Sequence, residues 1–396
     1  MKRVLYIDKS TLFGGAEECL FTLILDLDRS RFHPILCLER PMSHQTQFCV
    51  NGLEILYRIK EPHWWTKDFS QGPPLGLGHL QRLIYAEKLW GILMQTRPAI
   101  VHLNLYRRTA YLDLSLARLA GAVVIAHVRS LASQVPLSKN ILTRCDGIIC
   151  TSEIVRQEVV QVYPKDNVRL IYDGVSCMKY RYQGAREAAQ EFMSILPKTF
   201  VLSSIAMLYP RKGHDTAIRA MTKIVKHNPK SILLIVGGES NDSKGLEQSR
   251  LKELAESLGV ASHVRFLGHY SDMAALYAAS DAILALSVDG EAFGRVPIEA
   301  ACAQRPIIAT ALGATPEIID ADITGILIPA ADSDAVAAAA IRLNDNPLFC
   351  EELASKASER AKLMFSSQKH AENVQSFYDE LLGSSHQSNL RLGALV

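Results

Sequence analysis

The chain has 396 residues, of which 48% are hydrophobic and 21% charged, and its formal net charge is +2. This length exceeds what one hydrophobic core usually organises, and the composition is that of a soluble globular protein, so two domains are expected and disordered or fibrous classes are excluded. The small net charge, with no basic run in the sequence, excludes nucleic acid as a predicted partner.

The cysteines and the first residues bear on the cellular setting. The eight cysteines never form a C-x-x-C pair, and most lie in apolar segments where a thiol behaves as a small hydrophobe, so a reducing cytoplasmic setting is expected. The opening MKRVLYIDKS leads directly into a short β-branched run. No window reaches the roughly 18 apolar residues that a membrane span needs, so the chain is expected neither to be secreted nor to span a membrane.

Strand-like apolar runs with helix-length spacers begin at the amino terminus. In the first part they are VLYID (4–8), HPILCL (33–38), EILYRI (54–59), AIVHLN (99–104), VVIAHV (123–128), GIICTS (147–152) and VRLIYDGV (168–175). Such runs, separated by helical segments, predict a parallel sheet covered on both faces. We therefore expect a Rossmann-like domain over residues 1–178.

Three features of this first part carry polar chemistry. Gly14 and Gly15 lie between the first strand and a helix, where they permit close approach of a ligand or simply make a tight turn. His127 ends a strand, and an isolated histidine there is commonly a partly buried structural residue. His102 also ends a strand and has Asn104 two positions later.

An aromatic and basic segment, residues 61–98, offers a clue to a partner. It combines three tryptophans with four basic residues, namely Trp64, Trp65, Trp90, Lys67, Arg82, Lys88 and Arg97. That mixture suits an interfacial surface near a lipid-linked acceptor, at the inner face of a membrane. A core-facing amphipathic helix after a proline- and glycine-rich loop explains it equally well.

The strand rhythm restarts after about residue 180. The second set is FVLSSIAML (200–208), SILLIVGG (231–238), HVRFLG (263–268), AILALS (282–287), PIIAT (306–310) and GILIP (325–329). We predict a second Rossmann-like domain over 179–367, then a helix within 368–396 that packs back on the first domain and ends in a loose tail. The fold class is α/β with two doubly wound halves, and ligands are expected in the cleft between them, beyond the carboxyl ends of the strands.

The segment SVDGEAFGRVPIEAACAQRPIIAT, residues 287–310, sets Glu291 and Glu299 eight positions apart. Pro297 is well placed only in the first turn of a helix, so a helix should begin near Val296. The loop GEAFG and the helix N-terminus then form an anion site suited to a diphosphate. Because a carboxylate accepts hydrogen bonds from a vicinal diol, a glutamate on each side predicts a nucleotide-sugar ligand.

Residues 277–329 resemble the donor-site signature of the retaining nucleotide-sugar glycosyltransferases with the GT-B fold, the large glycosyl transferases group 1 family. Asp281, Ser287, Gly294, Ala300, Pro306, Gly313, Glu317 and Gly325 fall where that pattern has them. The resemblance implies that Glu291 contacts hydroxyls of the donor sugar and that Glu299 binds the ribose. The intervening loop would lie against the diphosphate and sugar, through Ala292, Phe293, Gly294, Arg295 and Val296.

The same resemblance assigns roles elsewhere in the chain. Arg211 and Lys212 would neutralise the leaving nucleotide, and they carry this role alone because Ala206-Met207 replaces the family's Gly-Arg pair. His127 would hydrogen-bond the donor sugar, and the glycines at 14 and 15 would face the donor from the opposite domain. The base is expected near the backbone of Gly268 to Tyr270, with UDP the default nucleotide and GDP an open alternative.

The implied reaction moves a hexose to a hydroxyl acceptor in polysaccharide, glycolipid or glycoside biosynthesis. It retains anomeric configuration, by front-face attack in which the departing phosphate helps take the acceptor proton. No metal is expected, because the pairs Asp26/Asp28, Asp320/Asp322 and Asp332/Asp334 read as solvated turns and caps. Two alternatives stay open: a sugar-nucleotide epimerase or hydrolase on the same architecture, and a noncatalytic nucleotide-sugar-binding subunit.

Overall fold

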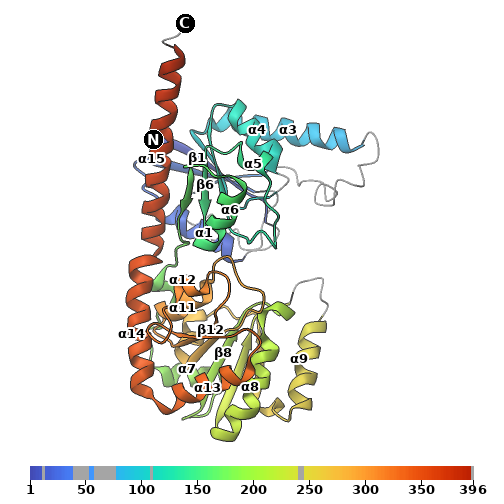
Figure 1. The fold of residues 1–396 in the computed structure, drawn as a ribbon, viewed down its shortest axis with the longest axis vertical. Coiled ribbons are helices and arrows are strands. Elements are labelled where there is room, and N and C mark those ends of the chain that lie inside the picture. The colour runs from blue at the N-terminus through green and yellow to red at the C-terminus, as the bar shows by residue number, and fades with distance from the viewer. Residues whose placement is uncertain (11–13, 39–52, 58–76, 108–109, 240–244, 394–396) are drawn as a thin grey trace. The chain divides into compact units, whose positions relative to one another are not determined.

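The computed structural model (Figure 1) describes residues 1–10, 14–38, 53–57, 77–107, 110–239 and 245–393. The chain divides into two compact units: unit 1 comprises Met1–Gly174 with Ser367–Val396, and unit 2 comprises Val175–Ser366. Each unit holds one parallel sheet flanked by helices, so the predicted α/β class is confirmed. Among the described residues, no helix is both long and apolar enough to cross a bilayer.

Unit 1 is built on a seven-stranded parallel sheet in the order β3-β2-β1-β4-β5-β6-β7. The strands are β1 (Lys2–Asp8), β2 (Phe32–Leu38), β3 (Glu54–Tyr57), β4 (Ile100–Leu103), β5 (Val123–Val128), β6 (Gly147–Cys150) and β7 (Val168–Leu170). Leu5 of β1 lies opposite Ile35 of β2 and Val101 of β4. The central strands are continuous apolar runs because helices cover both faces of the sheet.

The helices of unit 1 include one from the end of the chain. They are α1 (Gly15–Leu25), α3 (Leu77–Thr96), α4 (Tyr111–Leu119), α5 (Lys139–Leu142), α6 (Glu153–Val162) and α15 (Ser367–Gly393). Val374, Phe377 and Tyr378 of α15 join the core cluster of this sheet. Helix α15 continues to Gly393, beyond the residues that pack on this core. No proline interrupts this segment, so the hydrogen-bond ladder continues past the last apolar periodicity.

Unit 2 has a six-stranded parallel sheet in the order β10-β9-β8-β11-β12-β13. The strands are β8 (Phe200–Ile205), β9 (Ser231–Val236), β10 (Val264–Gly268), β11 (Ala282–Ala285), β12 (Ile307–Thr310) and β13 (Ile326–Ile328). The order of the strands changes direction between β8 and β11: β9 and β10 follow β8 to one side of the sheet, and β12 and β13 follow β11 to the other. In open α/β sheets this switch point separates the loops after the two strands and makes room for a ligand at their carboxyl ends.

The helices of unit 2 pack on both faces of that sheet (Figure 1). They are η3 (Cys177–Tyr180), α7 (Arg186–Phe192), η4 (Pro210–Lys212), α8 (His214–His227), α9 (Leu246–Ser257), η5 (Ala261–His263), α10 (Met273–Ala279), α11 (Arg295–Cys302), α12 (Thr315–Ile318), α13 (Ser333–Asp345) and α14 (Pro347–Met364). Leu202 and Leu233 of the strands pack with Ile218 and Met221 of α8 in the main core cluster.

One pair of cysteines departs from the predicted reduced thiols. Cys177 of η3 and Cys302 of α11 form a disulfide across a sequence separation of 125 residues. The sequence does not indicate that these two cysteines are neighbours, because they come together only when η3 packs against α11. Cys145 and Cys150 are buried free thiols, and Cys19 and Cys37 are buried too, as expected from their apolar segments.

Candidate functional site

The loops that follow β8 and β11 meet at the switch point of unit 2. The Val288 N–H donates to the Arg211 carbonyl at 2.9 Å, which ties the two loops together. Gly213 makes this approach possible, because its φ is +71° and a Cβ there would lie 2.0 Å from the Leu286 carbonyl oxygen. A glycine is therefore required at the junction of η4 and α8.

The side chains of Lys212 and Glu291 come together at this junction. The Lys212 Nζ lies 2.5 Å from Glu291 Oε1, and the Ser287 hydroxyl donates to the same oxygen at 2.5 Å. Burial alone would raise the pKa of Glu291, but the Lys212 charge and these two hydrogen bonds outweigh it and lower the pKa, so the group is a carboxylate. The two side chains remain 17% and 29% exposed, so a ligand can reach them.

The loop after β12 fixes the backbone of Glu291 from the other side. The Ala314 N–H donates to the Glu291 carbonyl at 2.9 Å, and the Thr310 hydroxyl donates to the Ser287 carbonyl at 2.7 Å. Gly313 has a φ of +57°, and a Cβ there would lie 2.3 Å from the Glu291 carbonyl oxygen. The loops after three strands that are adjacent in the sheet, β8, β11 and β12, thus hold Glu291 in place.

Helix α11 begins at Arg295, one residue before the predicted start, with Gly294 at its N-cap. Pro297 falls in the first turn, where it removes no intrahelical hydrogen bond. The first N–H groups of a helix have no intrahelical partner and carry the positive end of the dipole, which favours an anion. Ala292 is buried in the preceding loop, and the half-buried Phe293 ring lies 6.0 Å from that of Phe365.

Glu299 lies on the second turn of α11 and is 9% exposed. The Tyr277 hydroxyl of α10 donates to Glu299 Oε2 at 2.9 Å, and the Arg295 Nε donates to Oε1 at 3.2 Å. Sequence reasoning missed Tyr277, since it lies 22 positions before its partner. No spacing rule connects a residue on one helix with a residue on another.

The remaining predicted residues of unit 2 lie around the same sheet edge. Arg211 is exposed, and its guanidinium lies 3.8 Å from Asp289. Gly268 ends β10 with a φ of +64°, and its carbonyl accepts from the Gly237 N–H at 2.8 Å. Tyr270 is half-buried beside the apolar cluster under α10, and half-buried Val296 is the second residue of α11. The roles predicted for these residues stay predictions.

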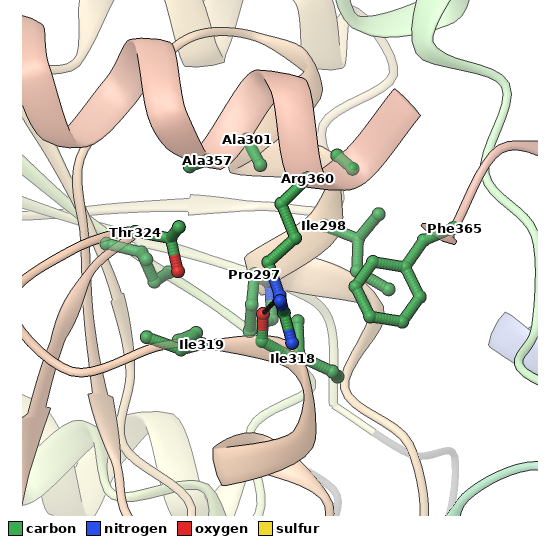
Figure 2. Close-up of a pocket in the computed structure, with 11 residues that line it drawn as sticks. Pro297, Ile298, Ala301, Ile318, Ile319, Thr324, Ala357, Arg360 and Phe365 are labelled. Carbon is green, nitrogen blue, oxygen red and sulfur yellow. Dashed lines mark hydrogen bonds between the residues drawn. The ribbon is translucent and has the colours of Figure 1, made fainter. Parts of the chain in front are cut away.

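Figure 2 shows a cavity under α11 and the residues that line it. The cavity is too small for a nucleotide sugar. Pro297, Ile298, Ile318 and Phe365 line it, and it has room for about one water molecule. Arg360 of α14 donates to the Ile318 carbonyl at 2.9 Å along its wall. The cavity is a packing gap between α11 and α14, and it takes no part in the site.

His127 lies in unit 1, on β5, and its side chain is fully buried. Arg129 Nη2 lies 3.1 Å from His127 Nδ1, so Nδ1 accepts and the ring proton is on Nε2. Burial, and then the Arg129 charge, lower the pKa of His127 well below its ordinary value, so the ring is neutral. Arg129 also pairs with the buried Asp173, and the His102 ring stacks 5.5 Å from that of His127.

The glycine turn of unit 1 is described from Gly14 onward. Gly14 is the N-cap of α1, and its N–H donates to the carboxylate of Glu17 at 2.7 Å. Gly15 is the first helical residue, and both glycines are exposed. This geometry fits either reading of the pair, a ligand-facing turn or a simple helix start.

The aromatic and basic segment is described only in part. Trp64, Trp65 and Lys67 lie outside the described residues. Trp90 is half-buried on α3, whose exposed face carries Leu80 and Leu83. Of the acidic pairs, Asp332 caps α13 by accepting from the Ala335 N–H at 2.8 Å, as predicted for a cap.

Two family profiles match the chain. The glycosyl transferases group 1 profile matches residues 186–364, and the glycosyltransferase family 4 profile matches residues 13–179. A curated relative, the D-inositol 3-phosphate glycosyltransferase of Saccharomonospora viridis, is 28% identical over 255 residues, which are 62% of this chain and 58% of the relative. The matched part thus spans little more than half the length of that relative.

Two solved structures have a similar fold. That of Anabaena HepE, determined in complex with UDP and glucose, has a TM-score of 0.81 at 20% identity and covers 95% of this chain and 99% of its own. A glycosyltransferase from Rickettsia africae also reaches 0.81 at 20% identity, covering 96% and 98%. The predicted GT-B fold is therefore confirmed, and residues 186–364, the part of the chain that carries Lys212, Glu291 and Glu299, belong to the glycosyl transferases group 1 family.

Proposed function

We propose that this chain transfers a sugar from a nucleotide-diphosphate sugar to a hydroxyl acceptor. The observation that carries the proposal is the accessible pair of Lys212 and Glu291 at the switch point of unit 2, beside the N-terminus of α11. A cation, a carboxylate and a helix N-terminus at one sheet edge supply what a diphosphate and a sugar each require.

The pair suggests how the site would respond to a donor. Lys212 would leave Glu291 Oε1 for the diphosphate, where its charge, with that of Arg211, stabilises the leaving group. Ser287 would keep its hydrogen bond to Glu291 and hold the carboxylate for the sugar hydroxyls. Such stabilisation needs no metal, and the departing phosphate would take the acceptor proton with retention of configuration.

The other predicted residues complete the proposal. Glu299 would accept hydrogen bonds from the ribose, and the backbone at Gly268 and Tyr270 would face the base. For His127 and the turn at Gly14 we keep the roles toward the donor that the family resemblance implies. UDP is the nucleotide to test first, since HepE was determined with it, and GDP is the alternative.

Our proposal for the acceptor rests on the hydroxyl acceptors that the family implies and on the name of the curated relative. A hydroxyl of a growing polysaccharide, glycolipid or glycoside fits the family, and inositol phosphate is the first candidate because of the name of the curated relative. Contact with the inner face of a membrane through α3 is proposed on its exposed leucines. Sedimentation with anionic vesicles at low salt tests it, and failure to sediment would remove it.

The decisive experiment begins with thermal unfolding of the wild type with UDP, GDP, ADP and CMP at millimolar concentration. One nucleotide should raise the midpoint by several degrees through ligand linkage. Lys212→Met should lose most of that rise, whereas Lys223→Met, which removes an exposed lysine paired with Asp334 in the same unit, should keep it. No shift with any nucleotide would contradict the proposal.

Product analysis then separates the reaction classes. The sugar nucleotide of the stabilising base is incubated with and without a hydroxyl acceptor, and the products are identified by mass and by the configuration at the anomeric carbon. Acceptor-dependent glycoside formation is expected. Without acceptor, free sugar together with the nucleoside diphosphate would instead indicate a hydrolase, and an isomerised sugar nucleotide would indicate an epimerase.

A further inference from the structure

Tyr277 makes the one hydrogen bond between α10 and the carboxylate of Glu299. Its side chain is fully buried, and its hydroxyl lies 2.9 Å from Glu299 Oε2. Burial, and then the charge of Glu299, raise the pKa of Tyr277 well above its ordinary value, so the phenol stays protonated and donates. A buried polar group of this kind is held by its partner and in turn holds it.

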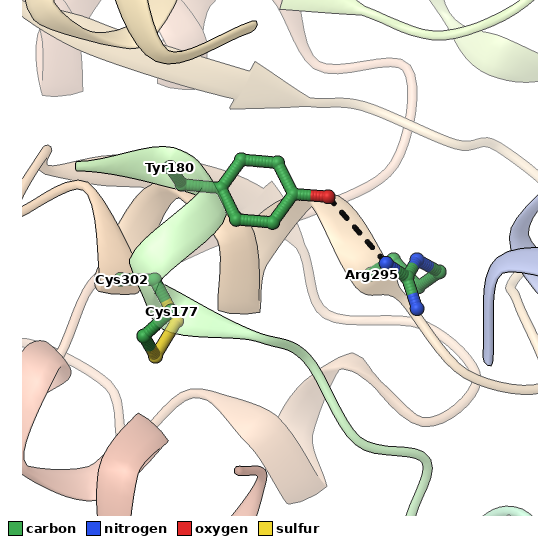
Figure 3. The surroundings of a disulfide bond; sticks show 4 residues. All are labelled: Cys177, Tyr180, Arg295 and Cys302. Atoms are coloured by element: carbon green, nitrogen blue, oxygen red, sulfur yellow. Dashed lines mark hydrogen bonds between the residues drawn. A yellow bond between two sulfur atoms is a disulfide. The ribbon is translucent and has the colours of Figure 1, made fainter. Parts of the chain in front are cut away.

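Arg295 constrains the second oxygen of the same carboxylate. Its Nε donates to Glu299 Oε1 at 3.2 Å, and its Nη2 donates to the Tyr180 hydroxyl at 3.5 Å (Figure 3). The Tyr180 and Tyr277 rings meet edge to face, with centroids 5.7 Å apart. Glu299 is therefore held by one residue of its own helix and by one residue of α10.

The segment that carries Tyr180 is itself anchored to α11. Figure 3 shows Cys177 and Cys302 joined at one side of η3 and Tyr180 reaching Arg295 at the other. Helix α11 is thus contacted near both of its ends by one short segment. Rotation or tilt of α11 would break these contacts, so the position of Glu299 is fixed at the level of the backbone as well as of the side chain.

The hydrogen-bond capacity of Glu299 leaves room for a ligand. An ionised carboxylate offers about four acceptor positions, and Tyr277 and Arg295 use one on each oxygen. The terminal torsion of a glutamate is broad and roughly two-fold, so an unrestrained carboxylate rotates freely. With Tyr277 in place, the remaining acceptor positions keep fixed directions, which is what recognition of two adjacent hydroxyls requires.

We propose that Tyr277 is a positioning residue that orients the Glu299 carboxylate for a vicinal diol of the bound nucleotide. This inference rests on the proposed function, in which Glu299 binds the ribose. Tyr277 touches no ligand itself and acts only through Glu299. Its loss should therefore weaken recognition of the diol and leave recognition of the rest of the nucleotide intact.

The test compares the affinities of UDP and 2′-deoxy-UDP by calorimetry. For the wild type, UDP should bind about tenfold more tightly, as one hydrogen bond to a charged group allows. Tyr277→Phe keeps the buried ring and removes the hydroxyl, so UDP affinity should fall about tenfold and the ratio should approach one. The matched control is Tyr85→Phe, which removes another buried phenol that donates to a carboxylate, Asp113 of unit 1, and should keep the wild-type ratio.

Each outcome decides between this inference and the proposed function. A folded Tyr277→Phe variant with the wild-type ratio overturns the role of Tyr277 and leaves the proposed function standing. A wild type that binds UDP without preferring it to 2′-deoxy-UDP also overturns the inference, since Glu299 then does not hold the diol. If the wild type binds none of UDP, GDP, ADP and CMP, the proposed function fails and the inference fails with it.

A thermodynamic cycle supplies a second measurement. If Tyr277 acts through Glu299, the losses of UDP affinity in Tyr277→Phe and Glu299→Gln should not add in the double variant. Additive losses would mean that the two residues act independently and would overturn the proposal.

Discussion

The two units place polar clusters on sheets of the same strand pattern, but they bury them differently. In unit 1, His127, Arg129 and Asp173 are 0%, 3% and 6% exposed. In unit 2, Lys212 and Glu291 keep 17% and 29% of their side-chain surface. When a buried ion pair is broken, no water reaches the charge that is left, so its loss is costly. In a partly exposed pair, water or a ligand can take the place of either charged group. The difference separates a sealed cluster in unit 1 from a pair in unit 2 whose members can exchange each other for a ligand.

The sealed cluster should give the largest loss of stability. Arg129→Met leaves the buried Asp173 carboxylate without its main cation, so the free energy of unfolding should fall by about 3–5 kcal/mol. Urea unfolding measures it. Arg342→Met, which breaks an exposed pair with Asp322, is the control and should cost less than about 1 kcal/mol. Equal losses in the two variants would erase the distinction between the units.

The accessible pair should show the reverse pattern, with activity lost and stability kept. Glu291→Gln preserves shape and removes the charge, so turnover should fall about 100-fold or more, as for other groups that act on the transition state. The unfolding midpoint should change little, because the side chain is partly exposed. Steady-state rates with the identified donor measure the loss, and full activity would show that Glu291 lies outside the site.

Unit 2 carries a covalent link of its own beside the site. Cys177→Ser should lower the free energy of unfolding by about 2–4 kcal/mol, and a reducing agent should bring the wild type to the same value. Cys350→Ser, which removes a half-buried free thiol, is the control. If peptide mapping without reductant finds no Cys177–Cys302 peptide, the two thiols are free in solution.

The buried histidines of unit 1 predict a smaller, pH-dependent effect. Burial, and then the Arg129 charge, lower the pKa of His102 from 6.5 to about 3 in the folded chain. As the pH falls below 6.5, the unfolded chain therefore binds protons that the folded chain does not, and stability falls by about 1.4 kcal/mol per pH unit for such a histidine. Above that pH the effect vanishes.

Unfolding in urea at pH 7 and pH 5 tests this slope. The lowered pKa of Asp173 acts only below its ordinary value of 3.8, outside this window. His102→Gln should flatten the slope, even if it changes the absolute stability. An unchanged slope in that variant would mean that His102 is protonated in the folded chain.

The sequence was informative wherever the signal was local. Apolar runs of strand length predicted the two parallel sheets, because a strand buried on both faces must be apolar throughout. Pro297 placed the start of α11 within one residue, since proline is tolerated only in the first turn. The extent of α15 to Gly393 has no such local signal, because a helix can continue beyond the last residue that packs on a core.

In the candidate site, too, the sequence determined the local features and the tertiary structure decided the contacts between elements. The sequence by itself determined the order of Lys212, Gly213, Glu291 and Glu299 along the chain and their association with strand ends. Only the tertiary structure decided that Ser287 and Lys212 share one oxygen of Glu291, that Tyr277 holds Glu299, and that Cys177 meets Cys302. These contacts join residues from different elements, and no local periodicity records which helix packs against which.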